Sequence, residues 1–222
     1  MSLTLYYHPL ASFCWKVQIA LHENGTPFTG EIVNLGEAQS RARFYEIWPV
    51  GKMPVIRDEK RARTVPETSI IIEYLDRHYP GAQKLLPADE ERRLDVRLWD
   101  RFFDLYIQQP MQRIVAQQLR PEGERDPRAV PESTATLQMA YDMLERQVAT
   151  WAVGDSFSMA DCAAFPGLFY ASTLVPFGEA RPKTAAYFER LVQRASVIRV
   201  LDEARPHFKY YPFRDAIPAR FL

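Results

Sequence analysis

The sequence predicts a small α/β domain followed by an all-helical domain. Short apolar runs alternate with helical periods over the first eighty or so residues, whereas strand signals largely vanish after Leu86-Pro87. From there on, apolar residues recur mainly at helical spacing. With 222 residues and 47% hydrophobic content, the chain is long enough for one large or two smaller packed domains.

The first domain opens with a βαβ unit. Residues Leu3–Tyr7 form a predicted buried strand, and Phe13–Glu23 form a helix in which apolar side chains repeat at helical spacing. The turn Asn24-Gly25-Thr26-Pro27 leads to a second strand at Glu31–Leu35. A polar stretch that is compatible with a helix then continues to Trp48.

Two further strands and a helix complete this domain. The segment PVGKMPVIRD, the charged turn DEKRAR and the segment TVP predict two short strands joined as a hairpin. The helix Thr68–Tyr79 follows with one apolar face, and Pro80-Gly81 ends it. We therefore expect a first domain at residues 1–80 and a linker at residues 81–89.

The remaining residues, 90–222, are expected to form the helical domain. The predicted helices span Glu90–Leu119, Glu132–Trp151, Ser158–Thr173 and Thr184–Ala204. In the stretch FSMADCAAF, Ser158 can cap a helix, and Asp161 can reach back to the N–H of Ser158, which is a capping box in its Asp form. Asp161 is therefore assigned a structural role, and Cys162 a place in the core.

Composition limits the kind of partner. The 28 basic and 28 acidic residues give a net formal charge of zero, which argues against nucleic acid or an anionic membrane as the partner. The two cysteines, Cys14 and Cys162, are too few for a disulfide framework or a cysteine-rich zinc site, so we expect no metal and a reducing cytoplasm. The N-terminus lacks the pattern of a signal peptide, and no apolar run is long enough to span a bilayer.

Three stretches carry the candidate chemistry: the helix start at Ser12, the GKMPVI segment, and Pro66-Glu67-Thr68. Together with the capping box, in this order and spacing, they resemble cytosolic glutathione transferases of a bacterial, serine-type-like kind. The resemblance covers nearly the whole chain. It implies a thioredoxin-like N-terminal domain that binds glutathione, a helical-bundle C-terminal domain that carries the electrophile pocket, and a homodimer.

The resemblance also implies the residues that hold glutathione. Pro54 would follow a cis peptide bond, and the backbone of Met53 would pair with the cysteinyl part of the cofactor. Glu67 and Thr68 are similar to the acidic and hydroxyl pair that grips the γ-glutamyl end, and Lys52 would reach the glycyl carboxylate. The chemistry is complementary, because a carboxylate can hold the ligand's ammonium and a helix N-terminus can hold its carboxylate.

The start of the first helix is suited to an anion, because its free N–H groups and positive dipole end favour negative charge. By resemblance, the hydroxyl of Ser12 donates to the glutathione sulfur and lowers the pKa of the thiol. The alignment puts Ala11 where many serine-type classes have their serine, and Tyr6 or Tyr7 at the strand end is an alternative donor. Cys14 is expected to pack into the domain.

The electrophile pocket is expected between the domains, on the long helix that begins at Glu90. Trp99, Phe103 and Tyr106 share one face of this helix and could receive an apolar substrate, although such a stripe is also typical of a helix-packing core. The aromatic tail HFKYYPFRD, from His207 onward, is expected to cover the body and to form one wall of this pocket.

These observations predict a cytoplasmic glutathione S-transferase that conjugates the glutathione thiolate to small hydrophobic electrophiles, with a role in detoxification. A glutathione-dependent isomerase or disulfide reductase would use the same cofactor site with a different acceptor. A non-catalytic interaction module of the same fold is the third alternative. The sequence alone does not separate these activities.

Overall fold

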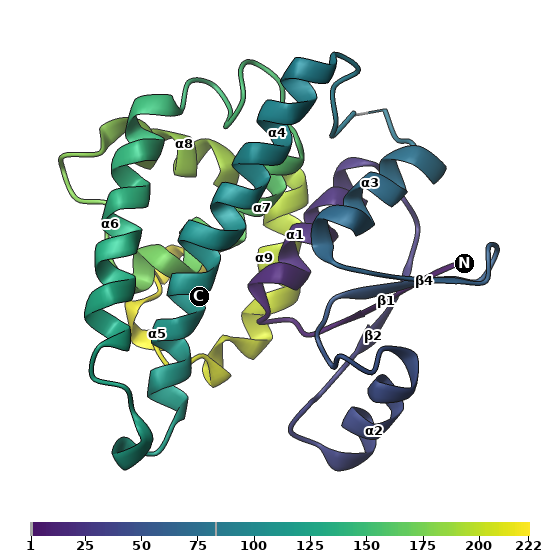
Figure 1. Cartoon of the computed structure of the whole chain (residues 1–222), viewed down its shortest axis with the longest axis horizontal. Coiled ribbons are helices and arrows are strands. Elements are labelled where there is room, and N and C mark those ends of the chain that lie inside the picture. Colours follow the sequence, from purple (N-terminus) through teal and green to yellow (C-terminus); the bar gives the residue numbers. More distant parts are fainter. Residues whose placement is uncertain (1, 83) are drawn as a thin grey trace.

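The computed structural model describes residues 2–82 and 84–222, which form two units (Figure 1). Met1, in the predicted domain 1–80, and Gln83, in the predicted linker 81–89, lie outside the described residues. The elements of the first unit are, in chain order, β1 (Leu3–Tyr7), α1 (Ser12–Glu23), β2 (Thr29–Ile32), α2 (Ala38–Ile47), β3 (Val55–Asp58), β4 (Arg63–Pro66) and α3 (Thr68–His78).

The four strands form one mixed sheet in the order β2-β1-β3-β4. β1 pairs in parallel with β2 and antiparallel with β3, so that Leu5 lies between Gly30 and Ile56. β3 and β4 form the predicted antiparallel hairpin. α1 and α3 pack on one face of the sheet, and α2 packs on the other (Figure 1). This is the thioredoxin-like domain that the sequence predicts.

The second strand is shifted from its predicted position at Glu31–Leu35. The parallel pairing is limited by the length of β1, whose last residue, Tyr7, lies opposite Ile32. Val33 still donates to the carbonyl of Tyr7 (2.8 Å) and then packs against Phe44 of α2. The apolar residues after Ile32 therefore serve the contact with α2 rather than the sheet.

The second unit is helical. Its elements are α4 (Glu90–Phe102), the π-helical segment η1 (Phe103–Gln108), α5 (Gln109–Leu119), the short turn η2 (Glu122–Glu124), α6 (Ala129–Gln147), α7 (Met159–Leu174), α8 (Pro182–Val192) and α9 (Ala195–Ala204). The tail adds the 3₁₀ turns η3 (Arg205–Tyr210), η4 (Arg214–Ala216) and η5 (Ala219–Phe221). In residues 2–82 and 84–222, no helix has both the length and the apolar character to cross a bilayer.

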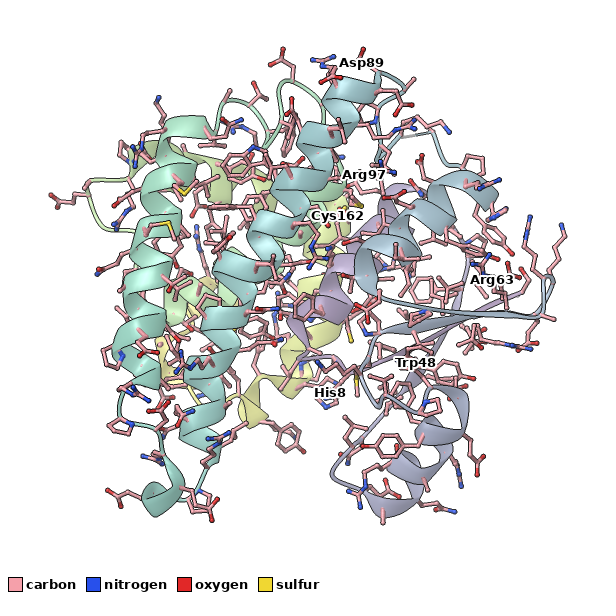
Figure 2. The ribbon with its side chains drawn as sticks, viewed as in Figure 1. His8, Trp48, Arg63, Asp89, Arg97 and Cys162 are labelled. Atoms are coloured by element: carbon pink, nitrogen blue, oxygen red, sulfur yellow. The ribbon has the colours of Figure 1, made fainter. Side chains whose placement is uncertain are left out.

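Helix α7 is the centre of this unit. Every residue from Met159 to Ala171 is buried, which is typical of a helix surrounded by other helices. Its start has the predicted capping box, in which Asp161 accepts from the N–H of Ser158 (2.8 Å). Cys162 follows inside the core, as predicted (Figure 2).

Two long helices of the sequence prediction are interrupted. The predicted helix Glu90–Leu119 changes to π-helical geometry at Phe103–Gln108. This segment ends two residues before Pro110, which has no N–H to offer the preceding turn. The predicted helix Thr184–Ala204 breaks where Arg194 adopts an extended conformation. The guanidinium of Arg194 there pairs with the carboxylate of Glu23 at the end of α1.

The two units meet along α1, which is buried on both sides. Val17 and Leu21 pack against the sheet and α3, whereas Trp15 and Ile19 belong to the core of the helical unit. Polar contacts join the same boundary, since the guanidinium of Arg97 on α4 donates twice to Glu73 on α3 (2.9 and 2.7 Å; Figure 2). The helical unit therefore provides one wall of any cavity at the start of α1.

Candidate functional site

A polar cavity of about 520 Å³ lies between the two units. It brings together all five residues that the sequence predicts for the cofactor, namely Lys52, Met53, Pro54, Glu67 and Thr68. The loop between α2 and β3 supplies the first three, and the junction between β4 and α3 supplies the other two. Segments that are separate in the sequence thus form one side of a single cavity.

The loop before β3 has the geometry that the family resemblance implies. The peptide bond between Met53 and Pro54 is cis. Strand pairing begins only at Val55, so the backbone of Met53 lies outside the ladder at the edge of the cavity. Gly51 has φ +71°, and a Cβ atom there would lie 2.1 Å from the ring of Tyr45, so this position favours glycine.

Glu67 and Thr68 are presented by the start of α3. Glu67 has φ 67°, a left-handed conformation that is uncommon outside glycine, and its side chain is exposed at the cavity. Thr68 is the first residue of α3, and the side chain of the N-cap residue, Glu67, makes no capping hydrogen bond. The first N–H groups of a helix have no acceptors within it, so this end of the cavity favours an anionic group.

The opposite wall comes from the helical unit. Arg101, Asp104, Gln109 and Gln112 line it, and sequence reasoning missed all four. Asp104 is buried beneath the cavity and pairs with the ammonium of Lys16 (2.8 Å). Burial and, to a smaller extent, the neighbouring Asp100 carboxylate raise the pKa of Asp104, although Lys16 opposes this shift.

The charges below this wall form a compact cluster. Lys16 is fully buried and also pairs with Asp100 (2.6 Å), while Arg101 pairs with Asp104 (3.3 Å). Two cations therefore balance two carboxylates. Ser69 on α3 accepts a hydrogen bond from Lys16 (3.0 Å) and donates to Asp100. The cluster thus connects α1, α3 and α4 with η1 directly beside the polar cavity.

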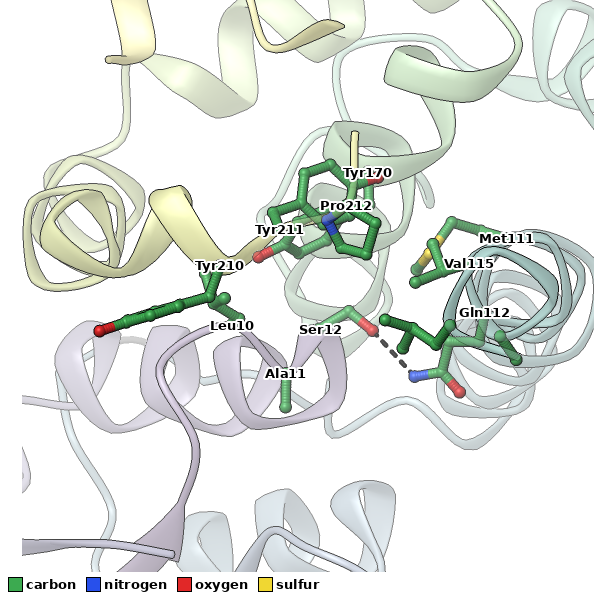
Figure 3. A pocket seen from close by; sticks show the side chains of 12 residues that line it. Leu10, Ala11, Ser12, Met111, Gln112, Val115, Tyr170, Tyr210, Tyr211 and Pro212 are labelled. Atoms are coloured by element: carbon green, nitrogen blue, oxygen red, sulfur yellow. Dashed lines mark hydrogen bonds between the residues drawn. The ribbon is translucent and has the colours of Figure 1, made fainter. Parts of the chain in front are cut away.

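An apolar cavity of about 290 Å³ adjoins the start of α1 (Figure 3). Met111 and Val115 of α5 line one side, and Tyr210 and Tyr211 of the tail line another. The tail therefore lies at a cavity wall, as expected from its aromatic residues. Gln112 lines both this cavity and the polar one, so the two cavities meet at its side chain.

Ser12 lies at this junction. It is the first residue of α1, only 3% exposed, and it lines the apolar cavity. Its hydroxyl oxygen accepts a hydrogen bond from the side-chain amide of Gln112 (3.2 Å; Figure 3). In the described part of the chain, the hydroxyl has no acceptor for its own proton. Ala11, which caps the helix and lines the same cavity, has no side-chain donor to offer.

The other candidate reactive groups near α1 lie elsewhere. Cys14 is fully buried, and this burial raises the pKa of its thiol to about 12, so it is a packing residue. Tyr6 packs against Phe44, and Tyr7 lines a separate cavity with His22. Neither tyrosine lines the polar or the apolar cavity.

The predicted aromatic stripe does not stay on one face. Trp99 is partly buried, Phe103 is fully buried in the core, and Tyr106 is 44% exposed. None of these three residues lines either cavity. The π-helical segment explains the difference, because five-residue hydrogen-bonded turns rotate the later residues away from the face that an α-helix would give them.

Comparison with known families supports this fold. A model of the glutathione S-transferase N-terminal domain matches residues 5–83, and a model of the glutathione S-transferase C-terminal domain matches residues 102–195. The chain belongs to the glutathione S-transferase family. The order of its two domains is the order in which these two models match.

Individual relatives are distant. Glutathione S-transferase A of Pleuronectes platessa is 24% identical over 204 residues, or 88% of this chain and 89% of that protein. Probable maleylacetoacetate isomerase 2 of Drosophila melanogaster is 27% identical over 170 residues, or 75% and 73% of the two chains. A crystal structure of a Methylobacillus flagellatus glutathione S-transferase with glutathione bound has a TM-score of 0.82 at 24% identity, and the match covers 90% of this chain and 98% of that one.

Proposed function

We propose that this protein is a glutathione transferase that binds glutathione in the polar cavity and conjugates it to small hydrophobic electrophiles. The observation that carries the proposal is the set of groups around one cavity. A free strand-edge backbone at Met53, a carboxylate at Glu67, an ammonium at Lys52 and a helix N-terminus at Thr68 are complementary to a zwitterionic peptide.

Each part of glutathione has a partner in this arrangement. The backbone of Met53 pairs with the cysteinyl unit, Glu67 holds the γ-glutamyl ammonium, and the N-terminus of α3 at Thr68 holds the adjacent carboxylate. Lys52 reaches the glycyl carboxylate. The cysteinyl sulfur then lies toward the start of α1, where the helix dipole and the Ser12 hydroxyl stabilise a thiolate.

The side chain of Gln112 leaves the Ser12 hydroxyl free to act as a donor toward the sulfur. In this structure Gln112 presents its Nε2 to Ser12 Oγ (3.2 Å), so the serine oxygen is the acceptor of that hydrogen bond and its own proton is left for the sulfur. Stabilising the thiolate raises its population at neutral pH, and the adjoining apolar cavity holds the electrophile next to it. We place the substrate there rather than against Trp99, Phe103 and Tyr106.

Two other activities would use the same cofactor site. The likeness to a protein named as a maleylacetoacetate isomerase makes glutathione-dependent isomerisation the second candidate. Disulfide reduction by Cys14 is disfavoured, because the pKa of this buried thiol is raised to about 12 by burial. A purely structural module would not need a zwitterion-binding cavity, so we favour an enzyme, with detoxification in the cytoplasm as its setting.

We further propose that the protein is a homodimer. Leu94 and Leu98 lie four residues apart on α4 and are 56% and 62% exposed. Met139 and Met143 on α6 are exposed at the same spacing, which is unusual for helix faces in contact with water. Light scattering at micromolar concentration should give twice the chain mass of 25.8 kDa, and a monomer mass would contradict the proposal.

Calorimetry with glutathione tests the main proposal. The wild-type protein should bind glutathione and conjugate it to 1-chloro-2,4-dinitrobenzene. Glu67→Gln should weaken binding at least tenfold, since a charge-assisted hydrogen bond is worth about 1.5–3 kcal/mol. Glu91→Gln, an exposed position in the first turn of α4, is the matched control and should bind normally.

The outcomes separate the parts of the proposal. A wild-type protein that does not bind glutathione would overturn it. Normal binding by Glu67→Gln would instead show that the γ-glutamyl group lies elsewhere. Binding without turnover of the aryl halide, together with isomerisation of a cis enone acid, would favour the second candidate.

A further inference from the structure

A third cavity, of about 520 Å³, lies toward the end of α1, where the two units also meet. Helix α9 lies alongside α1 (Figure 1), and it supplies Arg199 and Glu203 to one wall. The last turn of α1, the turn that follows it, and strands β1 and β2 supply the rest. Among the described residues, none lines both this cavity and the polar or the apolar one. It is therefore a separate site, which the proposed function does not use.

The N-terminal unit contributes three rings to this cavity. The rings of His22 and Phe28 have centroids 5.7 Å apart. The ring of Tyr7 lies over β2, since a Cβ atom added at Gly30 would lie only 3.0 Å from Cε1 of Tyr7. Glycine at this position leaves room for the ring. The three rings give the cavity a surface against which a hydrophobic side chain can pack.

Helix α9 contributes two opposite charges that touch each other. Nε of Arg199 donates to Oε1 of Glu203 (3.1 Å), and the two side chains are 64% and 36% exposed. The two Nη groups of Arg199 make no hydrogen bond in residues 2–82 and 84–222. Glu203 also accepts from Gln18 (3.1 Å). The neighbouring His22 and Arg199 lower the pKa of Glu203 although burial opposes them, so this carboxylate is ionised at neutral pH.

The hydroxyl of Tyr7 adds a polar group on the opposite wall. It has no hydrogen-bond partner in the described part of the chain, and its oxygen keeps accessible surface at the cavity. Burial and, to a smaller extent, the Glu203 carboxylate raise the pKa of Tyr7, so the phenol stays protonated as a donor. One cation, one carboxylate and one hydroxyl therefore face the same space, next to a set of rings.

We propose that this cavity binds an α-amino acid with an apolar side chain. The carboxylate of the ligand accepts from the Nη groups of Arg199 and from the hydroxyl of Tyr7, and its ammonium donates to Glu203. Its side chain packs against the rings of Tyr7 and Phe28. This proposal goes beyond the proposed function and does not depend on it, because glutathione and the electrophile are placed in the other two cavities.

The contact between Arg199 and Glu203 determines which charges fit. In an α-amino acid the ammonium and the carboxylate are attached to the same carbon, which matches two protein charges that are in direct contact. An acid or an amine alone would pair with one of these groups and place its charge beside the like charge of the other. The cavity therefore selects a zwitterion over either singly charged analogue.

Calorimetry with three ligands that share one ring tests the selection. L-phenylalanine has both charges, 3-phenylpropanoate lacks the ammonium, and 2-phenylethylamine lacks the carboxylate. The wild-type protein should bind phenylalanine about tenfold more tightly than either analogue, because each analogue loses a charge-assisted contact. Saturating phenylalanine should also raise the temperature of unfolding, since a ligand that binds only the folded state stabilises it.

Two variants locate the site. Glu203→Gln should weaken binding of phenylalanine about tenfold and remove its advantage over 3-phenylpropanoate. The matched control is Asp202→Asn, the next residue of α9, which is exposed, pairs with Arg205 and does not line the cavity. It should bind phenylalanine normally. Tyr7→Phe removes a hydroxyl that has no partner within the protein, so it should fold as the wild-type protein does and bind phenylalanine severalfold more weakly.

Glutathione provides the remaining control, because its γ-glutamyl end is itself an α-amino acid. Phenylalanine should bind equally well with and without saturating glutathione, and both variants should keep the wild-type affinity for glutathione. Competition between the two ligands would place phenylalanine in the polar cavity and overturn the inference. It would also be overturned if the wild-type protein did not prefer phenylalanine to both analogues, or if Glu203→Gln and Tyr7→Phe bound it normally. A protein that binds phenylalanine in this way but does not bind glutathione would refute the proposed function alone.

Discussion

At the scale of single residues, the polar cavity combines groups on short local motifs of the N-terminal unit with polar side chains of the helical unit. Lys52, Met53 and Pro54 are consecutive, and Glu67 and Thr68 mark a helix start, so their place at one cavity could be predicted from motifs. The helical half was not predictable in this way. Arg101, Asp104 and Gln112 are ordinary polar residues in sequence, and only the docking of the two units turns them toward the cavity.

Ser12 should determine how strongly the bound thiol is ionised. Ser12→Ala removes one donor to the sulfur but keeps the helix terminus, so the pKa of bound glutathione should rise while its affinity changes little. A lost hydrogen bond to a charged group is worth about 1.5–3 kcal/mol, which corresponds to a decrease of about tenfold to a hundredfold in conjugation rate at neutral pH. A pH titration of thiolate absorbance in the complex measures the shift.

Cys14→Ala is the control for this experiment, because Cys14 is two residues away but fully buried. It should leave the thiolate titration unchanged and reduce only stability, through a small cavity. If the titration of Ser12→Ala is unshifted, the stabilising group is the helix backbone rather than the hydroxyl. Loss of conjugation in a folded Cys14→Ala protein would instead support a disulfide reductase in which Cys14 is the reactive thiol.

At the scale of elements, local signals predicted the hairpin, the capping box and the segment around Pro54 correctly. Errors arose where tertiary contacts override local periodicity. The π-helical segment before Pro110 changes the helix register, and the contact of Arg194 with Glu23 accompanies a break in a long amphipathic pattern. Neither has a reliable sequence signal, because the apolar spacing on both sides is compatible with a continuous helix.

Asp58 at the end of β3 links the hairpin to the end of α3. Its carboxylate is fully buried and accepts hydrogen bonds from the hydroxyls of Tyr74 (2.6 Å) and Tyr79 (2.7 Å) and from the N–H of Arg61 (3.2 Å). Burial raises the pKa of Asp58, but these hydrogen bonds and the Arg61 side chain outweigh burial, so the net pKa is lowered. Ionised Asp58 therefore stabilises the folded domain.

The sign of this shift fixes how stability depends on pH. A carboxylate with a lowered pKa contributes stability above its unfolded pKa of about 3.9, and the contribution disappears as pH falls through the lower folded value. Asp58→Asn should thus cost about 1.5–3 kcal/mol at pH 7, and the difference from the wild-type protein should shrink below about pH 4. Urea unfolding across this range measures it, and a difference that stays constant would refute the assignment.

At the scale of the whole molecule, function depends on how the two units dock. Both cavities use residues from each unit, so neither unit contains a complete site. The sequence predicts two domains and an intervening pocket, but not the charges at their boundary. Lys16 lies within the apolar pattern of α1, and its side chain is fully buried beside the carboxylates of Asp100 and Asp104.

Lys16→Met should therefore destabilise the whole protein rather than one unit. Removing the cation leaves two buried carboxylates facing each other, and breaking a buried ion pair in this way costs about 3–5 kcal/mol. Lys16 opposes the rise that burial gives the pKa of Asp104, so this pKa should rise further in the variant. A buried acid with a raised folded pKa destabilises the folded state least when it is protonated. The penalty should thus be largest at neutral pH and smallest toward pH 4.

Urea unfolding of Lys16→Met at pH 7 and pH 4.5 tests this argument, with Lys60→Met as the control at an exposed lysine of the hairpin turn. The control should change the free energy of unfolding by less than about 0.5 kcal/mol at either pH. Because Asp104 and Arg101 line the polar cavity, Lys16→Met should also weaken glutathione binding under conditions where the protein remains folded. A penalty that is equal at both pH values would show that Lys16 contributes packing alone, without compensating the charge of Asp100 and Asp104.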